Sequence, residues 1–208
     1  LLFLLYLIIM HLFFSTPIWI SEINNCENIN KELLSFIYKE KEKHPDGTKK
    51  SNVKGWHSKE FDLKAEGLKN FIDEISKSIG GAINDMGWDL ETQLVKITSM
   101  WAIINKKDAF NEKHHHGNSA LSAAYYVKAE KNAGNIVFFD PRQANVFHHP
   151  TSKEVNSINA QVQSVTPKPG TLVLFPSYLE HKVNPNLSNS ERIVISFNVS
   201  LIRKKDLL

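Results

Sequence analysis

Two amphipathic stretches in the first half of the chain predict helices. Residues 27–43 intersperse leucine, isoleucine and phenylalanine among charged positions at the spacing of a helix with one apolar face. Residues 60–79 repeat this pattern, and Gly80 with Gly81 is expected to break or kink the second helix. Residues 45–56, between the two, are polar and lysine-rich, so we expect a surface loop there.

After Gly87 the pattern changes to short runs rich in β-branched and aromatic residues, which are typical of strands. These runs are residues 95–104, 121–127, 135–139, 161–165, 171–175 and 192–199. Turns containing proline, glycine or asparagine separate them, with no helical pattern between them. This organisation predicts a mainly β fold with flanking helices, either a sandwich, a jelly roll or a barrel. We expect one domain over residues 12–208, with a helical front (12–90) and a β core (91–200).

The composition excludes several classes of protein. A hydrophobic fraction of 42% is enough to bury a core. The 25 basic and 22 acidic residues nearly balance, so the charge does not indicate nucleic-acid binding. The single cysteine, Cys26, excludes an intrachain disulfide and any cysteine-rich metal site. One cysteine also fits the reducing cytoplasm, where we expect this protein to act.

The first nine residues are almost wholly apolar. Polar residues interrupt the apolar run before it reaches the length of a membrane-spanning helix, and no basic residue precedes it as in a signal peptide. We therefore expect Met10 to be the start, residues 1–11 to be a leader outside the domain, and no membrane partner. A membrane anchor, a cleaved signal and a buried segment are the alternatives.

Three consecutive histidines supply the candidate chemistry. His114 and His116 lie before the predicted strand that starts near Leu121, and in an extended chain they share a side while His115 points away. His181 follows the predicted strand 171–175. Three imidazoles on one side of a metal leave open positions, an arrangement that suits non-haem Fe(II) and dioxygen. A histidine run in a solvated loop is the alternative interpretation.

A longer stretch resembles a known family. Residues 114–127 are similar to the H-x-H-x-x-S-x-L-S-G-x-Y-Y-V signature of Fe(II)/2-oxoglutarate-dependent oxygenases of marine bacteria and phages, with Ala123 in place of the glycine. Residues 134–142, 169–177, 181–186 and 191–198 resemble the same family. The resemblance covers nearly the whole chain from about residue 12 onward. More distantly, the paired tyrosines and the late histidine and arginine resemble the prolyl hydroxylases.

This resemblance implies a double-stranded β-helix, or jelly roll, that uses Fe(II) and the cosubstrate 2-oxoglutarate. It implies a hydroxylase that releases succinate and carbon dioxide. The expected metal ligands are His114, His116 and His181, and the expected 2-oxoglutarate-binding residues are Arg192, Tyr126 and Ser196. A planar guanidinium offers two parallel donors to a carboxylate, so Arg192 suits the distal carboxylate of 2-oxoglutarate.

The chain departs from the broader superfamily in its second metal ligand, which is usually Asp or Glu. His116, Asn118 and Asp140 are the candidates for that position, and His116 is the one we favour. A third neutral ligand makes the site more positive by one unit. We expect Asp140 to form a turn and Arg142 to pair with an acid.

Two competing hypotheses and two open questions follow. A three-histidine, cupin-like metalloenzyme that does not use 2-oxoglutarate is the first alternative, and Arg192 argues against it. A non-catalytic jelly-roll binding module is the second. The substrate, small-molecule or peptidyl, and the oligomeric state are left open. The tryptophans Trp56, Trp88 and Trp101 are expected to pack beneath the helices.

Overall fold

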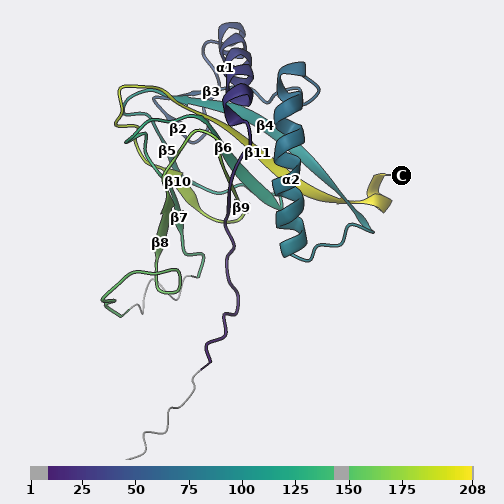
Figure 1. The fold of residues 1–208 in the computed structure, drawn as a ribbon, viewed down its shortest axis with the longest axis vertical. Coiled ribbons are helices and arrows are strands. Elements are labelled where there is room, and N and C mark those ends of the chain that lie inside the picture. The colour runs from purple at the N-terminus through teal and green to yellow at the C-terminus, as the bar shows by residue number, and fades with distance from the viewer. Residues whose placement is uncertain (1–8, 143–149, 208) are drawn as a thin grey trace, which may run out of the picture.

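Two antiparallel sheets face each other in the computed structural model, which describes residues 9–142 and 150–207 (Figure 1). The elements are β1 (Trp19–Glu22), α1 (Cys26–Lys43), β2 (Asn52–Val53), β3 (Trp56–His57), η1 (Glu66–Leu68), α2 (Lys69–Asp85), β4 (Gln93–Asn105), β5 (Phe110–His114), β6 (Leu121–Lys128), β7 (Ile136–Phe139), β8 (Val162–Val165), β9 (Thr171–Pro176), β10 (His181–Val183), β11 (Arg192–Arg203) and η2 (Lys204–Leu207). One sheet has the order β1-β9-β6-β11-β4-β3, and the other has the order β2-β5-β10-β7-β8. This is a double-stranded β-helix with flanking helices, as the sequence predicts.

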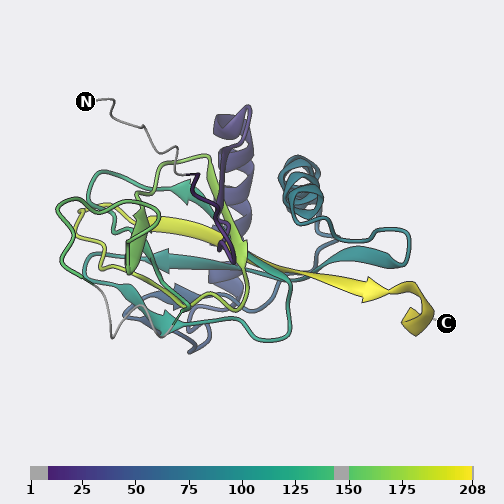
Figure 2. The same cartoon turned by 90° about the horizontal axis from the view of Figure 1, so that it is seen from below.

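Both helices cover the outer face of the six-stranded sheet (Figure 2). The apolar side of α1 buries Leu33 and Ile37, and that of α2 buries Phe71 and Ile75. These side chains meet the outward residues of the sheet in one hydrophobic core. Burial of this apolar face, more than intrinsic propensity, stabilises the two helices.

A second, smaller core lies between the two sheets. Along β6, Tyr125 belongs to the outer core and Tyr126 to the inner one, because successive side chains point to opposite faces. Leu121 to Val127 are buried without interruption. The strand therefore lacks the polar alternation of a half-exposed strand, since both of its faces are covered.

The second helix differs from its prediction at both ends. Residues 60–65 are not helical: Asp62 caps a turn through Lys64 N, and helical structure begins with η1. Gly80 and Gly81 do not end the helix, and α2 continues to Asp85. It ends before Gly87, whose φ of 63° is the left-handed conformation that commonly terminates helices.

The predicted surface loop at residues 45–56 is also structured in part. It contains β2, which pairs with β5, and Trp56, which is buried in β3. The expected leader lies mostly outside the described residues, which begin at Ile9. Among the helices in the described part of the chain, none is long and apolar enough to cross a membrane.

Candidate active site

A cavity of about 740 Å³ opens between the two sheets. Its walls come from β4, β6 and β11 of the larger sheet and from β5, β7 and β10 of the smaller one. The segment around β2 and β3 closes a further side, with Ser51 and His57 among its lining residues. His57 and Arg192, which are 135 positions apart in the chain, thus line the same cavity, or chamber.

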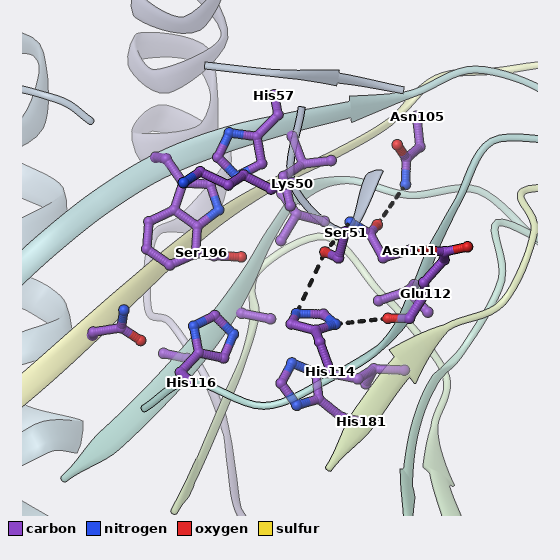
Figure 3. Close-up of a pocket in the computed structure, with 18 of the residues that line it drawn as sticks. Lys50, Ser51, His57, Asn105, Asn111, Glu112, His114, His116, His181 and Ser196 are labelled. Atoms are coloured by element: carbon purple, nitrogen blue, oxygen red, sulfur yellow. Dashed lines mark hydrogen bonds between the residues drawn. The ribbon is translucent and has the colours of Figure 1, made fainter. Parts of the chain in front are cut away.

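Three of the predicted side chains meet in this chamber (Figure 3). His114 ends β5, His181 begins β10 opposite it, and His116 follows two residues after His114. One nitrogen from each ring lies within 4.8 Å of the others. His114 ends a strand of its own, β5, rather than lying at the edge of the strand that starts at Leu121. His115 is exposed and does not join the group.

Hydrogen bonds orient two of these rings. His114 Nδ1 lies 2.7 Å from the carbonyl oxygen of Glu112, and His181 Nδ1 lies 2.9 Å from that of Leu179. A carbonyl oxygen can only accept, so each Nδ1 carries the hydrogen. In the neutral rings Nε2 is then the lone-pair nitrogen, which is the form that binds a metal.

Burial keeps all three rings neutral. It lowers the pKa of His181 to about 3 and that of His116 to about 4, and it lowers the pKa of His114 as well. Neighbouring histidines add to each shift, because one imidazolium disfavours another. Three neutral imidazoles at neutral pH fit a divalent ion such as Fe(II).

Neither alternative to His116 reaches the site. Asn118 is exposed, in a turn where its φ is 65°. Asp140 holds Arg142 through two side-chain hydrogen bonds of 2.8 and 3.0 Å, which is the acid pairing predicted for that arginine. Within the described ranges, the histidines alone form a group that could bind a metal.

Arg192 lies buried at the start of β11, 1% exposed. Its Nη1 donates to the carbonyl oxygens of Ala133, Gly134 (3.1 Å) and Asn184 (3.0 Å). Gly134 has a φ of 87°, and a Cβ there would lie 2.6 Å from Nη1, so glycine permits this approach. Arg192 Nη2 is buried and has no partner among the described residues. Burial lowers the pKa of Arg192 to about 10, which leaves it charged at neutral pH.

Tyr126 and Ser196 share the chamber with Arg192. Burial raises the pKa of Tyr126 to about 12, against the opposing effect of Arg192, so its hydroxyl stays protonated. Ser196 lies on the same face of β11 as Arg192, two alternations along the strand. A buried cation with a free donor, beside a neutral hydroxyl, fits a carboxylate ligand.

Sequence reasoning missed the β2–β3 side of the chamber. Ser51 Oγ lies 3.5 Å from His114 Nε2 and accepts a hydrogen bond from Asn111, which in turn accepts one from Asn105 (Figure 3). These residues carry no motif, and β2 becomes a strand only through its pairing with β5.

Trp101 is the other miss, because it does not pack beneath the helices. It lines the cavity, and its ring stacks at 5.7 Å on both His57 and His116. Alternation along β4 could have indicated this, because Met100 and Ala102 form the apolar outer face and Trp101 lies between them.

Comparison with known proteins gives a match to one family and to many solved structures with a similar fold. Residues 99–198 match the family described as "Putative 2OG-Fe(II) oxygenase". Among proteins of curated function, none is significantly similar in sequence.

Several solved structures share the fold. A Pseudomonas putida prolyl-4-hydroxylase is 15% identical with a TM-score of 0.62, over 89% of this chain and 93% of that one. HygX from Streptomyces hygroscopicus, solved with nickel, 2-oxoglutarate and hygromycin B, is 13% identical with a TM-score of 0.61, over 89% and 83%. The α-ketoglutarate-dependent epimerase SnoN from nogalamycin biosynthesis is 10% identical with a TM-score of 0.65, over 89% and 77%.

Proposed function

We propose, from a double-stranded β-helix whose residues 99–198 match the 2-oxoglutarate–Fe(II) oxygenases, that this protein is an Fe(II)- and 2-oxoglutarate-dependent dioxygenase. We further propose that it hydroxylates its substrate and releases succinate and carbon dioxide. The observation that carries the proposal is one cavity that contains both a cluster of three neutral imidazoles and a buried guanidinium whose Nη2 has no partner among the described residues. Neither feature alone would indicate this chemistry.

His114, His116 and His181 hold the metal in this proposal. The carbonyl oxygens of Glu112 and Leu179 fix the rings of His114 and His181, so that Nε2 carries the lone pair in each. The Ser51 hydroxyl, 3.5 Å from His114 Nε2, would give way to the ion. The trio supplies no negative charge, which distinguishes this site from one with a carboxylate ligand. Bound Fe(II) supplies the oxidative chemistry that the side chains of this chain lack.

Arg192 orients the cosubstrate. Three backbone carbonyl oxygens hold its Nη1, so the guanidinium cannot swing, and Nη2 is the donor left for the distal carboxylate of 2-oxoglutarate. Tyr126 adds a neutral hydroxyl beside it, and Ser196 lies further along the same strand. At the metal end of the cavity, Phe138 and Phe175 of the inner core lie against His181 and keep water from that side of its ring.

Anaerobic titration with Fe(II) and then 2-oxoglutarate tests the proposal. A visible metal-to-ligand charge-transfer band should develop with the parent protein, because such a band requires 2-oxoglutarate to bind directly to the Fe(II) ion. The band should require much more 2-oxoglutarate in Arg192→Ala, and His181→Ala should not develop it. No band in the parent protein at saturating Fe(II) and 2-oxoglutarate would refute the assignment.

The all-histidine ligand set favours one second candidate, a three-histidine metalloenzyme that does not use 2-oxoglutarate. Arg192 distinguishes the two, because a buried cation with a free donor has no evident purpose without an anionic cosubstrate. Formation of succinate from 2-oxoglutarate by the Fe(II)-loaded protein supports the first candidate. Metal-dependent turnover of other compounds without succinate would support the second.

A further inference from the structure

Uncharged polar side chains line the cavity on the larger sheet, beyond the arginine end. Ser99 and Trp101 lie on β4, and in the strand register Asn198 and Ser196 of β11 lie opposite them. All four line the cavity, because alternate residues of each strand point to the inner face. We call Ser99, Trp101 and Asn198 the polar wall, and leave Ser196 with the cosubstrate end.

A directed chain of hydrogen bonds leads into this wall. Ser122 Oγ donates to Asn198 Oδ1 over 2.8 Å. A serine hydroxyl has one hydrogen, so Ser177 Oγ must be the donor in its 2.8 Å bond to Ser122 Oγ. Asn198 Nδ2 then donates to Ser99 Oγ over 3.0 Å. Ser122 and Ser177 are completely buried, which holds the direction of the chain.

Ser99 ends this chain as a hydroxyl that has accepted but not donated. No described residue accepts its hydrogen, and Ser99 lines the cavity. The hydroxyl hydrogen of Ser99 is therefore available for donation to a group inside the cavity.

Trp101 supplies a second free donor next to Ser99. Trp101 as a whole is 8% exposed, and its Nε1 has no hydrogen-bond partner in the part of the chain that the structure describes. By contrast, Trp19 Nε1 donates to Asp85 and Trp56 Nε1 donates to the His44 carbonyl oxygen. A buried N–H without a partner is unfavourable unless a ligand completes it.

The charges around the cavity favour a neutral acceptor at this wall. Its three residues are uncharged, and Arg192 lies at the start of β11, six residues before Asn198. The other charged lining residues, which are all exposed, are Lys50, Lys59, Glu60, Glu112 and Lys113. A carboxylate against the wall would lose water without gaining a charged hydrogen-bond partner from the wall itself, whereas a carbonyl oxygen needs only the two donors.

We propose that the polar wall binds the primary substrate, and that Ser99 Oγ–H and Trp101 Nε1–H donate to an uncharged carbonyl oxygen, as in an amide. The inference rests on the proposed function, because it leaves the Arg192 end to 2-oxoglutarate. Trp101 stacks on His116, so a carbonyl group held by the wall lies beside the metal ligands. The substrate class is then an amide-bearing compound whose oxidised carbon lies close to that carbonyl.

The indole N–H resonances of the ¹⁵N-labelled full chain, free of metal so that no ion attracts an anion beside Trp101, test this inference. The resonance lost in Trp101→Phe identifies Trp101. Propanamide should shift it saturably, with and without 2-oxoglutarate, whereas the isosteric anion propanoate should not. The indole resonances of Trp19 and Trp56 should not move, because their donors are already occupied.

Variants at Ser99 provide the second measurement. Ser99→Ala should weaken propanamide binding about fivefold, the value of one hydrogen bond. Ser99→Thr keeps the hydroxyl and should restore the affinity. Ser76→Ala, on the exposed side of α2, is the matched control and should bind propanamide as the parent does.

Three outcomes would overturn the inference. Propanoate could shift the Trp101 resonance as strongly as propanamide, or neither probe could shift it. Alternatively, 2-oxoglutarate alone could shift it and bind more weakly to Ser99→Ala, which would assign the wall to the cosubstrate. Failure of the proposed function is separate: 2-oxoglutarate would then bind independently of Arg192, and the propanamide titration without 2-oxoglutarate would still be informative.

Discussion

The two faces of the six-stranded sheet come from the same strands but differ in chemistry. The outer face buries Met100, Ile195 and Phe197 completely beneath the two helices. The inner face, one residue along each strand, presents Trp101 and Ser196 to the cavity. The period of two therefore separates a face that stabilises the fold from one that binds ligands.

The difference also shows how the cavity stays open. In the register of the central strands, Ala124 and Ser196 lie side by side on the inner face. These small side chains leave space that the outer face fills with large ones such as Phe197 and Tyr125. The outer face is thus closely packed throughout, whereas part of the inner face is not packed and borders the cavity. Substitutions on the two faces should have separable effects.

The largest effect on folding is expected from Phe197→Ala on the outer face. Removal of this fully buried ring should lower the free energy of unfolding by about 3–5 kcal/mol, since a cavity remains in a packed core. Urea denaturation measures the change, and Fe(II) affinity of the folded fraction should be unaltered. Leu94→Ala, at a half-exposed position of β4, should cost less than about 1 kcal/mol. Equal losses of stability in both variants would mean that the buried outer face does not stabilise the fold more than an exposed position does.

His181→Ala, in the cavity, should weaken Fe(II) binding and leave the protein folded. Loss of one of three ligands should weaken Fe(II) binding by more than about a hundredfold, while the folded structure persists. Anaerobic competition with a colorimetric chelator measures the affinity. His115→Ala, at the exposed member of the histidine run, is the control and should change it less than about threefold. A comparable loss in His115→Ala would remove the basis for the assigned trio.

Arg192→Lys should affect the cosubstrate alone. The charge remains but the planar pair of donors is lost, so 2-oxoglutarate should bind about tenfold more weakly to the Fe(II) protein. Titration of the charge-transfer band gives the constant, and Fe(II) affinity serves as the internal reference. Arg142→Lys, whose guanidinium pairs with Asp140, should bind 2-oxoglutarate normally.

The smallest effect concerns pH in the metal-free protein. The three ligand histidines have folded pKa values below their ordinary value, and burial is the main cause. The unfolded chain takes up protons on these residues below about pH 6.5, so stability is complete above that pH and decreases as the pH falls toward 4. His116→Gln should lessen this decrease by up to about 1.4 kcal/mol per pH unit, measured by urea denaturation. An unchanged slope would mean that His116 does not remain neutral.

The longer elements could be predicted because each has a complete local pattern. Residues 27–43 coincide with α1 to within one residue, and the runs at 121–127 and 171–175 match β6 and β9 almost as closely. Their apolar residues follow a helical spacing or form uninterrupted buried strands. The predicted start of the second helix, at residue 60, was wrong. Amphipathic spacing alone does not show where the turn at Asp62 ends and the helix begins.

Short elements could not be predicted, and they build one side of the site. β2, β3 and β10 have two or three residues each, too few for a period, and they exist through pairing with distant strands. His57 and Ser51 reach the chamber on such segments. No motif marks them, because their role depends on position alone.

The sequence by itself determined the chemistry available here: histidines at alternate positions, a later histidine, and an arginine at the start of an apolar strand. Those residue types define which ligands could be bound, whatever the path of the chain. Only the tertiary structure decided which groups meet, because the pairing of β5 with β10 brings His114 to His181 while Asp140 turns to Arg142. Strand pairing between distant segments sets such distances, and a linear pattern contains no information on them.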